Sequence, residues 1–114
     1  MNAALLPIGK NKFQKILAEE VIYCEASTGC TNIHLLNGRI FMVYRTLSFV
    51  ELQLQVPYIV RISRSYLLNL NHVVGVQTGC EAKIEVCNEG VIRINEKIAR
   101  EVKRLLLQHI DNEQ

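Results

Sequence analysis

The dipeptide Asn37-Gly38 restricts the fold more than any other feature, because it lies between two short runs of β-forming residues. Asn-Gly readily adopts the backbone conformation of a tight turn, and between such runs it is the strongest short signal for a β-hairpin. The flanking runs are TNIHLL and RIFMVY. The sequence therefore predicts a hairpin over residues 31–44.

Similar β-rich runs recur along most of the chain. Besides the hairpin they predict strands at residues 21–26, 58–63, 73–79, 82–87 and 91–94. Two segments favour helices instead: Thr46 is a suitable N-cap for a short helix that ends before Pro57, and Asn95 is a suitable N-cap for an amphipathic helix near the C-terminus. We therefore expect a mainly β fold of short, mostly antiparallel strands in small sheets, with a short internal helix and a C-terminal helix.

The length of 114 residues fits a single domain. Residues 1–11 contain Pro7 and Gly9 without a clear period, so we expect a loosely ordered start. The domain should span residues 12–110, and residues 111–114 should form a tail. No apolar run approaches the roughly 20 residues that span a bilayer, and no signal peptide is visible. We expect a cytoplasmic protein whose four cysteines are reduced.

The charge is unevenly distributed, although its total is only +2. Between residues 26 and 80 the bases are four arginines, against the single acid Glu51. Arginine forms paired hydrogen bonds to phosphate or guanine, which lysine cannot do. The region therefore fits a polyanionic partner, although charged strand edges that discourage aggregation would give the same pattern.

Patterns typical of catalysis and metal binding are missing from the sequence. The three histidines are scattered, no Cys-x-x-Cys pair occurs, and the glycines fall singly without a phosphate-binding pattern. No pair of carboxylates is indicated either. We therefore expect that the protein is not an enzyme and has no metal or cofactor.

The arginines of VRISRSYLLNLNHVV pose a geometric problem. Arg61 and Arg64 are three residues apart, so on a regular strand Arg64 would share a face with apolar neighbours. A strand that ends near Ser63 would instead project Arg64 from its tip, with Ser65 available for a backbone or phosphate hydrogen bond. Pairing of Arg64 with a nearby carboxylate is the alternative. Asn69 is expected to cap the following turn.

The same stretch resembles the core motif of the LytTR-type DNA-binding domain, a module of bacterial transcription factors with the approximate pattern R-x-H-R-S-Y-L-V-N-L-x-x-I. Two upstream blocks, EEVIYCEASTGCTNIHL and YRTLSFVE, are also similar to the family. Together the blocks cover about residues 15–105. The resemblance implies an elongated domain that inserts loops into successive major grooves of double-stranded DNA, for sequence-specific binding in transcriptional regulation.

The resemblance also implies three DNA-facing positions. They are the loop at residues 28–32, Arg64 with the residue before it, and the start of the last helix at residues 95–97. Arg64 is expected to read a base edge, whereas other residues contact phosphate or position the loops. The full set of candidate DNA-binding residues is Cys30, Thr31, Asn32, Arg45, Arg61, Ser63, Arg64, Ser65, Asn95 and Lys97.

Three departures from the family pattern fall at these positions. Ser63 stands where the family usually has histidine, Gly29-Cys30 replaces Asn-Tyr, and Asn95-Glu96 replaces Ser-Arg. A carboxylate at Glu96 repels phosphate unless it accepts a hydrogen bond from a cytosine amino group. The alternative function is therefore a protein-interaction module that keeps the fold without specific DNA readout.

The resemblance suggests further partners. Family members commonly occupy paired direct repeats, which implies double-stranded DNA with such repeats and a weak homodimer on DNA. Others are joined to an upstream receiver domain or are restrained by a membrane protein. No acidic receiver pocket precedes the β-rich region, so we expect either an excised domain or a stand-alone regulator.

Overall fold

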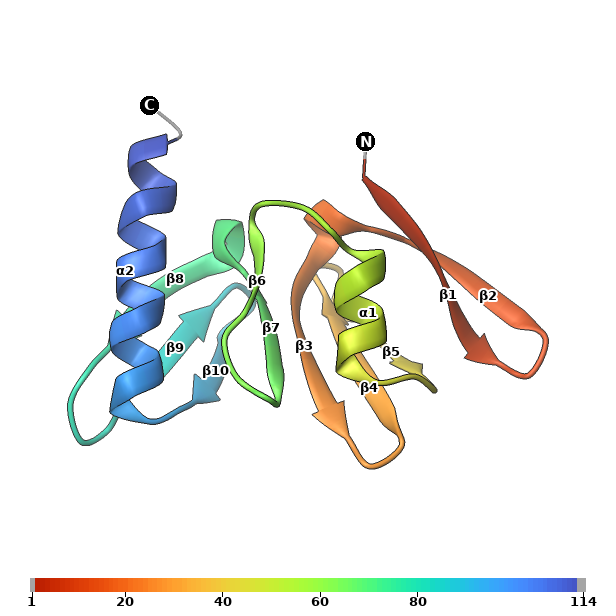
Figure 1. Cartoon of the computed structure of the whole chain (residues 1–114), viewed down its shortest axis with the longest axis horizontal. Helices are drawn as coiled ribbons and strands as arrows, with labels where there is room; N and C mark the ends of the chain where they lie inside the picture. The colour runs from red at the N-terminus through yellow and green to blue at the C-terminus, as the bar shows by residue number, and fades with distance from the viewer. Residues whose placement is uncertain (1, 113–114) are drawn as a thin grey trace. The chain divides into compact units, whose positions relative to one another are not determined.

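The structure is a computed structural model that describes residues 2–112. The chain divides into two compact units, the first ending at Asn69 and the second beginning at Leu70. Each unit contains antiparallel strand pairs and one α-helix (Figure 1). The expected fold class, mainly β with small antiparallel sheets, an internal helix and a C-terminal helix, is confirmed.

The first unit begins with an antiparallel hairpin of β1 (Ala3–Gly9) and β2 (Lys12–Leu17). Leu6 and Ile16 are buried on its inner face. The expected loosely ordered start is therefore wrong for residues 3–9, and residue 1 lies outside the described residues. Pro7 is tolerated because the sheet has only two strands and its register shifts between Pro7 and Gly9.

A five-stranded antiparallel sheet forms the rest of the first unit's β structure. Its order is β5-β4-β3-β7-β6, with β3 (Val21–Ser27), β4 (Cys30–Leu35), β5 (Ile40–Val43), β6 (Ile59–Arg61) and β7 (Tyr66–Asn69). The pairing of β4 with β5 confirms the predicted hairpin over residues 31–44. In its turn, Gly38 adopts a φ of +86°, and the backbone N–H of Arg39 donates to Asn37 Oδ1 at 2.9 Å.

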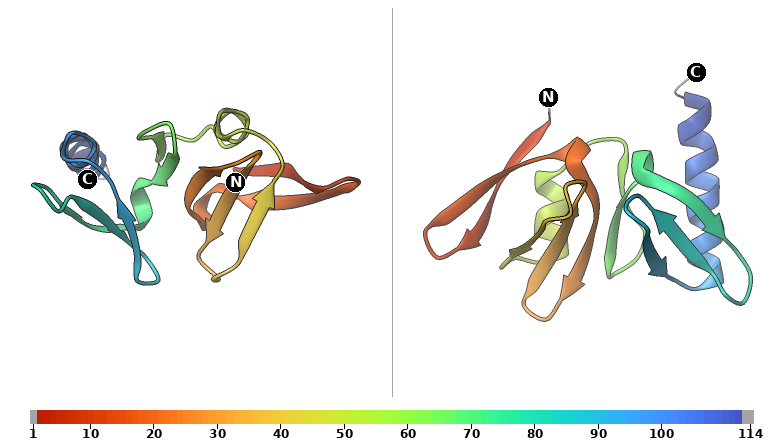
Figure 2. Two further views of the ribbon diagram at one scale, coloured as in Figure 1. Left: turned by 90° about the horizontal axis from the view of Figure 1, so that it is seen from below. Right: turned by 180° about the vertical axis from the view of Figure 1, so that it is seen from behind.

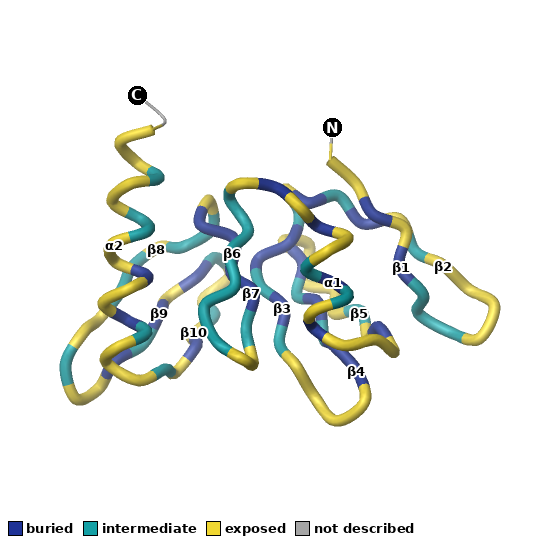
Figure 3. Tube along the Cα trace, in the orientation of Figure 1, coloured by how far each residue is buried: buried dark blue, intermediate teal, exposed yellow. Residues whose placement is uncertain are grey.

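The internal helix α1 (Leu47–Gln53) also matches the prediction. The hydroxyl of Thr46 accepts a hydrogen bond from the backbone N–H of Phe49 at 3.2 Å, and the helix ends before Pro57. Leu47 and Val50 face inward and are buried. Helix, hairpin and sheet share one apolar core, whose members are among the dark segments of the first unit in Figure 3; they include Leu6, Ile16, Ile33, Leu35, Leu47, Leu54 and Leu67.

The strand β7 is an element that the sequence did not predict. It lies between β3 and β6 and pairs with both. Asn69, expected to cap a turn, is instead fully buried at the end of β7. Its side-chain amide donates to the carbonyl of Val21 at 2.9 Å and to that of Ala18 at 3.4 Å, in or next to the short 3₁₀ turn η1 (Ala18–Glu20). Buried amides require such partners, so Asn69 ties β7 to the start of β3.

The second unit begins with the 3₁₀ turn η2 (Leu70–His72) and contains a three-stranded sheet and a long helix. The sheet order is β10-β9-β8, with β8 (Val73–Gln77), β9 (Lys83–Val86) and β10 (Gly90–Arg93). Helix α2 (Glu96–Asn112) packs against β8. The predicted cap is confirmed, because Asn95 Oδ1 accepts from the backbone N–H of Ile98 at 2.8 Å.

The C-terminal tail expected at residues 111–114 begins within this helix. Residues 111 and 112 belong to α2, and residues 113–114 lie outside the described residues. Over residues 2–112, neither α-helix has the length and apolar character needed to cross a bilayer.

A polar cluster occupies the outer face of the five-stranded sheet. The rings of Tyr23 and His34 stack with their centroids 4.1 Å apart, and His34 Nε2 lies 2.9 Å from Glu25 Oε1. Tyr66 lies nearby, with its ring centroid 6.2 Å from that of Tyr23. Burial, reinforced by the Glu25 carboxylate, raises the pKa of both tyrosines above the ordinary value of 10.0.

These tyrosines predict a loss of stability in alkali. The folded state favours the neutral phenols. Their contribution to the free energy of unfolding is therefore complete below the unfolded-state pKa and is lost as pH rises through the folded-state pKa. We expect the free energy of unfolding, measured with urea, to fall above about pH 10 and to fall less steeply in Tyr23→Phe. An equally steep decline in Tyr23→Phe would show that its phenol contributes nothing.

Candidate nucleic-acid interface

Three connections of the first unit, β3 to β4, β5 to α1 and β6 to β7, emerge at the same end of the five-stranded sheet, because its strands are antiparallel. A fourth, the turn of the separate β1–β2 hairpin, slants outward and lies to the side of them on the lower part of the unit in Figure 1 and in the right view of Figure 2. A pocket of about 580 Å³ opens between the first three of these connections. Among the described residues its lining includes three arginines and no acid; the arginines are Arg45, Arg61 and Arg64.

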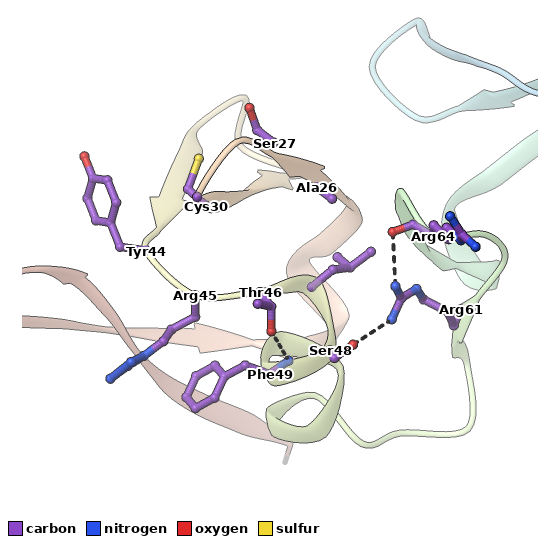
Figure 4. Close-up of a pocket in the computed structure, with 12 residues that line it drawn as sticks. Ala26, Ser27, Cys30, Tyr44, Arg45, Thr46, Ser48, Phe49, Arg61 and Arg64 are labelled. Atoms are coloured by element: carbon purple, nitrogen blue, oxygen red, sulfur yellow. Dashed lines mark hydrogen bonds between the residues drawn. The ribbon is translucent and has the colours of Figure 1, made fainter.

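Arg61 fixes the connection between β6 and β7. Its Nε donates to the carbonyl of Ser63 at 2.6 Å, and its Nη2 donates to the carbonyl of Arg64 at 3.1 Å. On the other side, its Nη1 donates to Glu51 Oε1 at 3.1 Å and to the hydroxyl of Ser48 at 3.3 Å. The guanidinium therefore joins helix α1 to the loop, which assigns Arg61 a positioning role inside the protein (Figure 4).

Backbone hydrogen bonds hold the same loop, residues 62–65, from its other sides. The N–H of Ile62 donates to the carbonyl of Tyr66 at 3.1 Å, and the N–H of Ala26 donates to the carbonyl of Ser65 at 2.8 Å. Within the loop, the N–H of Ser65 donates to the Ser63 hydroxyl at 3.1 Å. Ser63 is therefore used in the turn itself, whereas the exposed side chain of Ser65 faces solvent.

Arg64 projects from this loop. The spacing of the two arginines predicted a strand that ends near Ser63, and β6 ends two residues earlier, at Arg61. Figure 4 shows the carbonyl of Arg64 turned toward Arg61 and its guanidinium turned away from it. The side chain of Arg64 is exposed, and no ion pair joins it to another residue within 2–112. The alternative of carboxylate pairing is therefore not observed in the described part of the chain.

Arg45 is a second exposed arginine beside the pocket. Its guanidinium lies over the ring of Phe49, 5.2 Å from the centroid, which restrains the side chain by a cation–π interaction (Figure 4). The carbonyl of Arg45 accepts a hydrogen bond from the hydroxyl of Thr31 at 2.9 Å. Thr31 therefore fixes the backbone from which Arg45 extends.

The expected loop at residues 28–32 is shorter than the resemblance implied. Strand β3 ends at Ser27 and β4 begins at Cys30, so the turn consists of Thr28 and Gly29, with a φ of +73° at Gly29. As members of β4, Cys30 and Thr31 are both buried. Thr31 uses its hydroxyl within the protein, whereas Cys30 lines the pocket, and DNA contact by either residue stays a prediction. Asn32 is half-buried and pairs with Glu25 and Met42 within the sheet.

The other candidate residues belong to the second unit. Asn95 is exposed but uses its side-chain oxygen to cap α2, and Lys97 is exposed in the first turn of that helix. The carboxylate of Glu96 pairs with Arg100 one turn later. This ion pair offsets part of the charge that Glu96 would present to phosphate.

Sequence reasoning missed the partners that Arg61 finds on α1. Ser48 and Glu51 precede Arg61 by 13 and 10 residues, and only the packing of α1 beside the sheet brings them together. No sequence spacing signals such a contact. Metal chemistry has no candidate centre in the described residues, where no three histidine, cysteine or acidic side chains cluster.

Comparison with known proteins gives a family and a fold. The sequence model of the LytTr DNA-binding domain matches residues 11–107. The structure is similar to the LytTr DNA-binding domain of a Bacillus cereus protein described as a methyl-accepting/DNA response regulator. The TM-score is 0.72 at 18% sequence identity, covering 93% of this chain and 97% of that one. The search of curated protein sequences gives no match.

The family assignment agrees with the geometry of the first unit. The match extends over most of the chain and includes the Arg64 loop, Arg45 and the start of α2. The family is one of DNA-binding domains rather than enzymes. The chain therefore belongs to the LytTr DNA-binding domain family.

Proposed function

We propose that the protein binds double-stranded DNA sequence-specifically to regulate transcription, with the 62–65 loop entering a major groove. The observation that carries this proposal is the exposed guanidinium of Arg64 on a loop held by Arg61. An arginine of this kind can donate both of its outer N–H groups to O6 and N7 of one guanine. Because the loop is already fixed, little conformational entropy is lost when it binds.

The remaining exposed candidates fit a supporting role. Arg45 and Lys97 are exposed cations, and neither forms an ion pair within residues 2–112. The Ser65 hydroxyl is an exposed hydrogen-bond donor beside Arg64. Such groups suit phosphate oxygens, which position a protein on DNA without reading its sequence.

Selection of duplexes from a random pool tests the proposal directly. We expect the selected sequences to converge on a motif containing guanine, and a gel-shift assay to give tighter binding to the selected duplex than to a scrambled one. Paired direct repeats are the expected arrangement, so two copies of the chain should bind a selected site. Binding without any sequence preference would contradict the proposed readout.

Replacing Lys97 with alanine should weaken binding to selected and scrambled duplexes alike. A lysine that contacts phosphate contributes to the release of counterions, so its loss should flatten the slope of log K against log salt by about 0.9. Lys103→Ala, also exposed and nearly two turns further along α2, is the matched control. An unchanged slope for Lys97→Ala would remove Lys97 from the interface.

The same assays distinguish the alternative, a protein-interaction module without DNA readout. That function predicts no duplex binding even at low salt, where electrostatic attraction to phosphate is strongest. Co-purification of a specific protein partner together with this result would favour the alternative.

A further inference from the structure

The charges of the first unit are separated between its two ends. At the end that holds the four connections, the acids within the described residues are Glu25, two residues before the end of β3 and paired with His34, and Glu51, which is bonded to Arg61. The bases at that end are Lys10, Lys12, Arg45, Arg61 and Arg64. The rest of the unit holds two bases and two acids, namely Lys15, Arg39, Glu19 and Glu20. All of the excess positive charge therefore lies at the end with the connections.

Two of these bases belong to the β1–β2 turn, which is outside the pocket. Lys10 lies in the turn and Lys12 begins β2, and both side chains are exposed. Neither forms an ion pair with another residue in the described part of the chain. In Figure 1 and the right view of Figure 2, the hairpin slants downward and outward, so that its turn lies on the lower part of the unit, to the side of the β3–β4 and β6–β7 connections.

The hairpin holds this turn in place. Leu6 and Ile16, from its two strands, are fully or almost fully buried in the core that also contains Leu47 of α1 and Val43 of β5. The pairing of Gly9 with Lys12 closes the hairpin at the turn itself. The buried core contacts and the strand pairing therefore hold the hairpin, and with it Lys10 and Lys12, at a fixed place on the first unit.

We propose that the β1–β2 turn is a second DNA-contacting element, in which Lys10 and Lys12 bind the phosphate backbone beside the site reached by Arg64. This inference rests on the proposed function and extends the protein surface that contacts DNA. A lysine ammonium is a compact charge suited to phosphate but not to paired recognition of a base. The turn therefore contributes affinity and salt dependence, whereas the 62–65 loop contributes sequence preference.

An anionic membrane surface is the competing partner for a basic hairpin with exposed apolar residues. Leu5 and Phe13 are 63% and 58% exposed on the outer face. Side chains alternate along a strand, so Lys12 lies on the same side of β2 as buried Ile16 and on the opposite side from Phe13. A membrane-binding hairpin would combine its lysines with that apolar face, where Lys15, opposite Leu5, lies but Lys12 does not. The position of Lys12 and the shared end with Arg64 favour DNA.

The test is a salt titration of DNA binding with the parent chain, Lys10→Gln, Lys12→Gln and the double variant. Each single substitution should flatten the slope of log K against log salt by about 0.9. For the double variant, the affinity ratio of parent to variant should shrink about 12-fold between 50 and 200 mM salt. The ratio of affinities for selected and scrambled duplexes should stay at the parent value.

Arg39→Gln is the matched control, because it removes one exposed positive charge from the β4–β5 turn at the other end of the unit. It should leave the slope unchanged. If the double variant and Arg39→Gln both keep the parent slope, the inference is overturned while the proposed function stands. If Arg39→Gln flattens the slope of log K against log salt as much as each lysine variant does, the effect depends only on net charge, and the inference is overturned as well.

Two further outcomes are separable. If the parent chain binds no duplex at any salt concentration, the proposed function fails and the inference fails with it. If the parent binds phosphatidylserine vesicles, and both Phe13→Ser and the double lysine variant abolish that binding without changing the salt slope on DNA, the hairpin is assigned to a membrane surface instead. Urea unfolding midpoints equal to that of the parent will show that the variants fold.

Discussion

Arg61→Ala is expected to lower the free energy of unfolding by about 2 kcal/mol, because it removes charged hydrogen bonds to two loop carbonyls and to α1. We also expect the variant to lose preference for the selected duplex over a scrambled one. Its salt slope should remain that of the parent, because a guanidinium bonded inside the protein contacts no phosphate. Urea unfolding and salt-dependent gel shifts measure these three quantities.

Arg61→Lys separates positioning from charge. A lysine ammonium keeps the positive charge, but it is a compact group that lacks the planar fork needed to donate to Ser63, Arg64 and α1 together. We therefore expect Arg61→Lys to lose sequence preference as Arg61→Ala does, with a smaller loss of stability. Full rescue of preference by lysine would show that the positive charge, rather than the fixed loop, is what Arg61 supplies.

Arg64→Ala is expected to weaken binding to the selected duplex by about 1–3 kcal/mol, or about 5- to 150-fold, and to relax specificity at one base pair. The cause is the loss of paired hydrogen bonds to a guanine. Binding to scrambled DNA should change much less. Stability should change little, because the Arg64 side chain is exposed and forms no ion pair within residues 2–112.

Arg39→Ala is the control for Arg64→Ala, since Arg39 is also an exposed arginine of the first unit. It should leave the ratio of selected to scrambled affinity unchanged. Selection from a random pool with Arg64→Ala should return a motif that is degenerate at one position. If Arg64→Ala binds both duplexes as the parent does, its role as the base-reading residue is wrong.

A double-mutant cycle joins these two predictions. If Arg61 acts on DNA through the position of Arg64, then Arg61→Ala should cost little further affinity in a chain that already carries Arg64→Ala. Additive losses would instead indicate that Arg61 contacts DNA independently. The cycle therefore tests the coupling that the hydrogen bond from Arg61 to the Arg64 carbonyl suggests.

The sequence by itself determined the features that depend on near neighbours. The hairpin over residues 31–44 and the caps at Thr46 and Asn95 were all predicted correctly, because each depends on groups a few residues apart. The end of β6 before Arg64 followed from strand alternation alone. The family resemblance connected these local signals over about residues 15–105 and is confirmed by the match over residues 11–107.

The tertiary structure decided which polar residues remain available to a ligand. Strand β7 escaped prediction because it is an interior strand between β3 and β6, and its run of three consecutive buried residues shows no alternating pattern. Thr31 is buried because the turn before it has only two residues. Arg61 finds Ser48 and Glu51 only when α1 packs beside the sheet. In the sequence, Arg61 and Arg64 are simply two arginines three residues apart. Burial and long-range hydrogen bonds are properties of the packed chain, and they distinguish Arg61, which positions the loop, from Arg64, which is exposed.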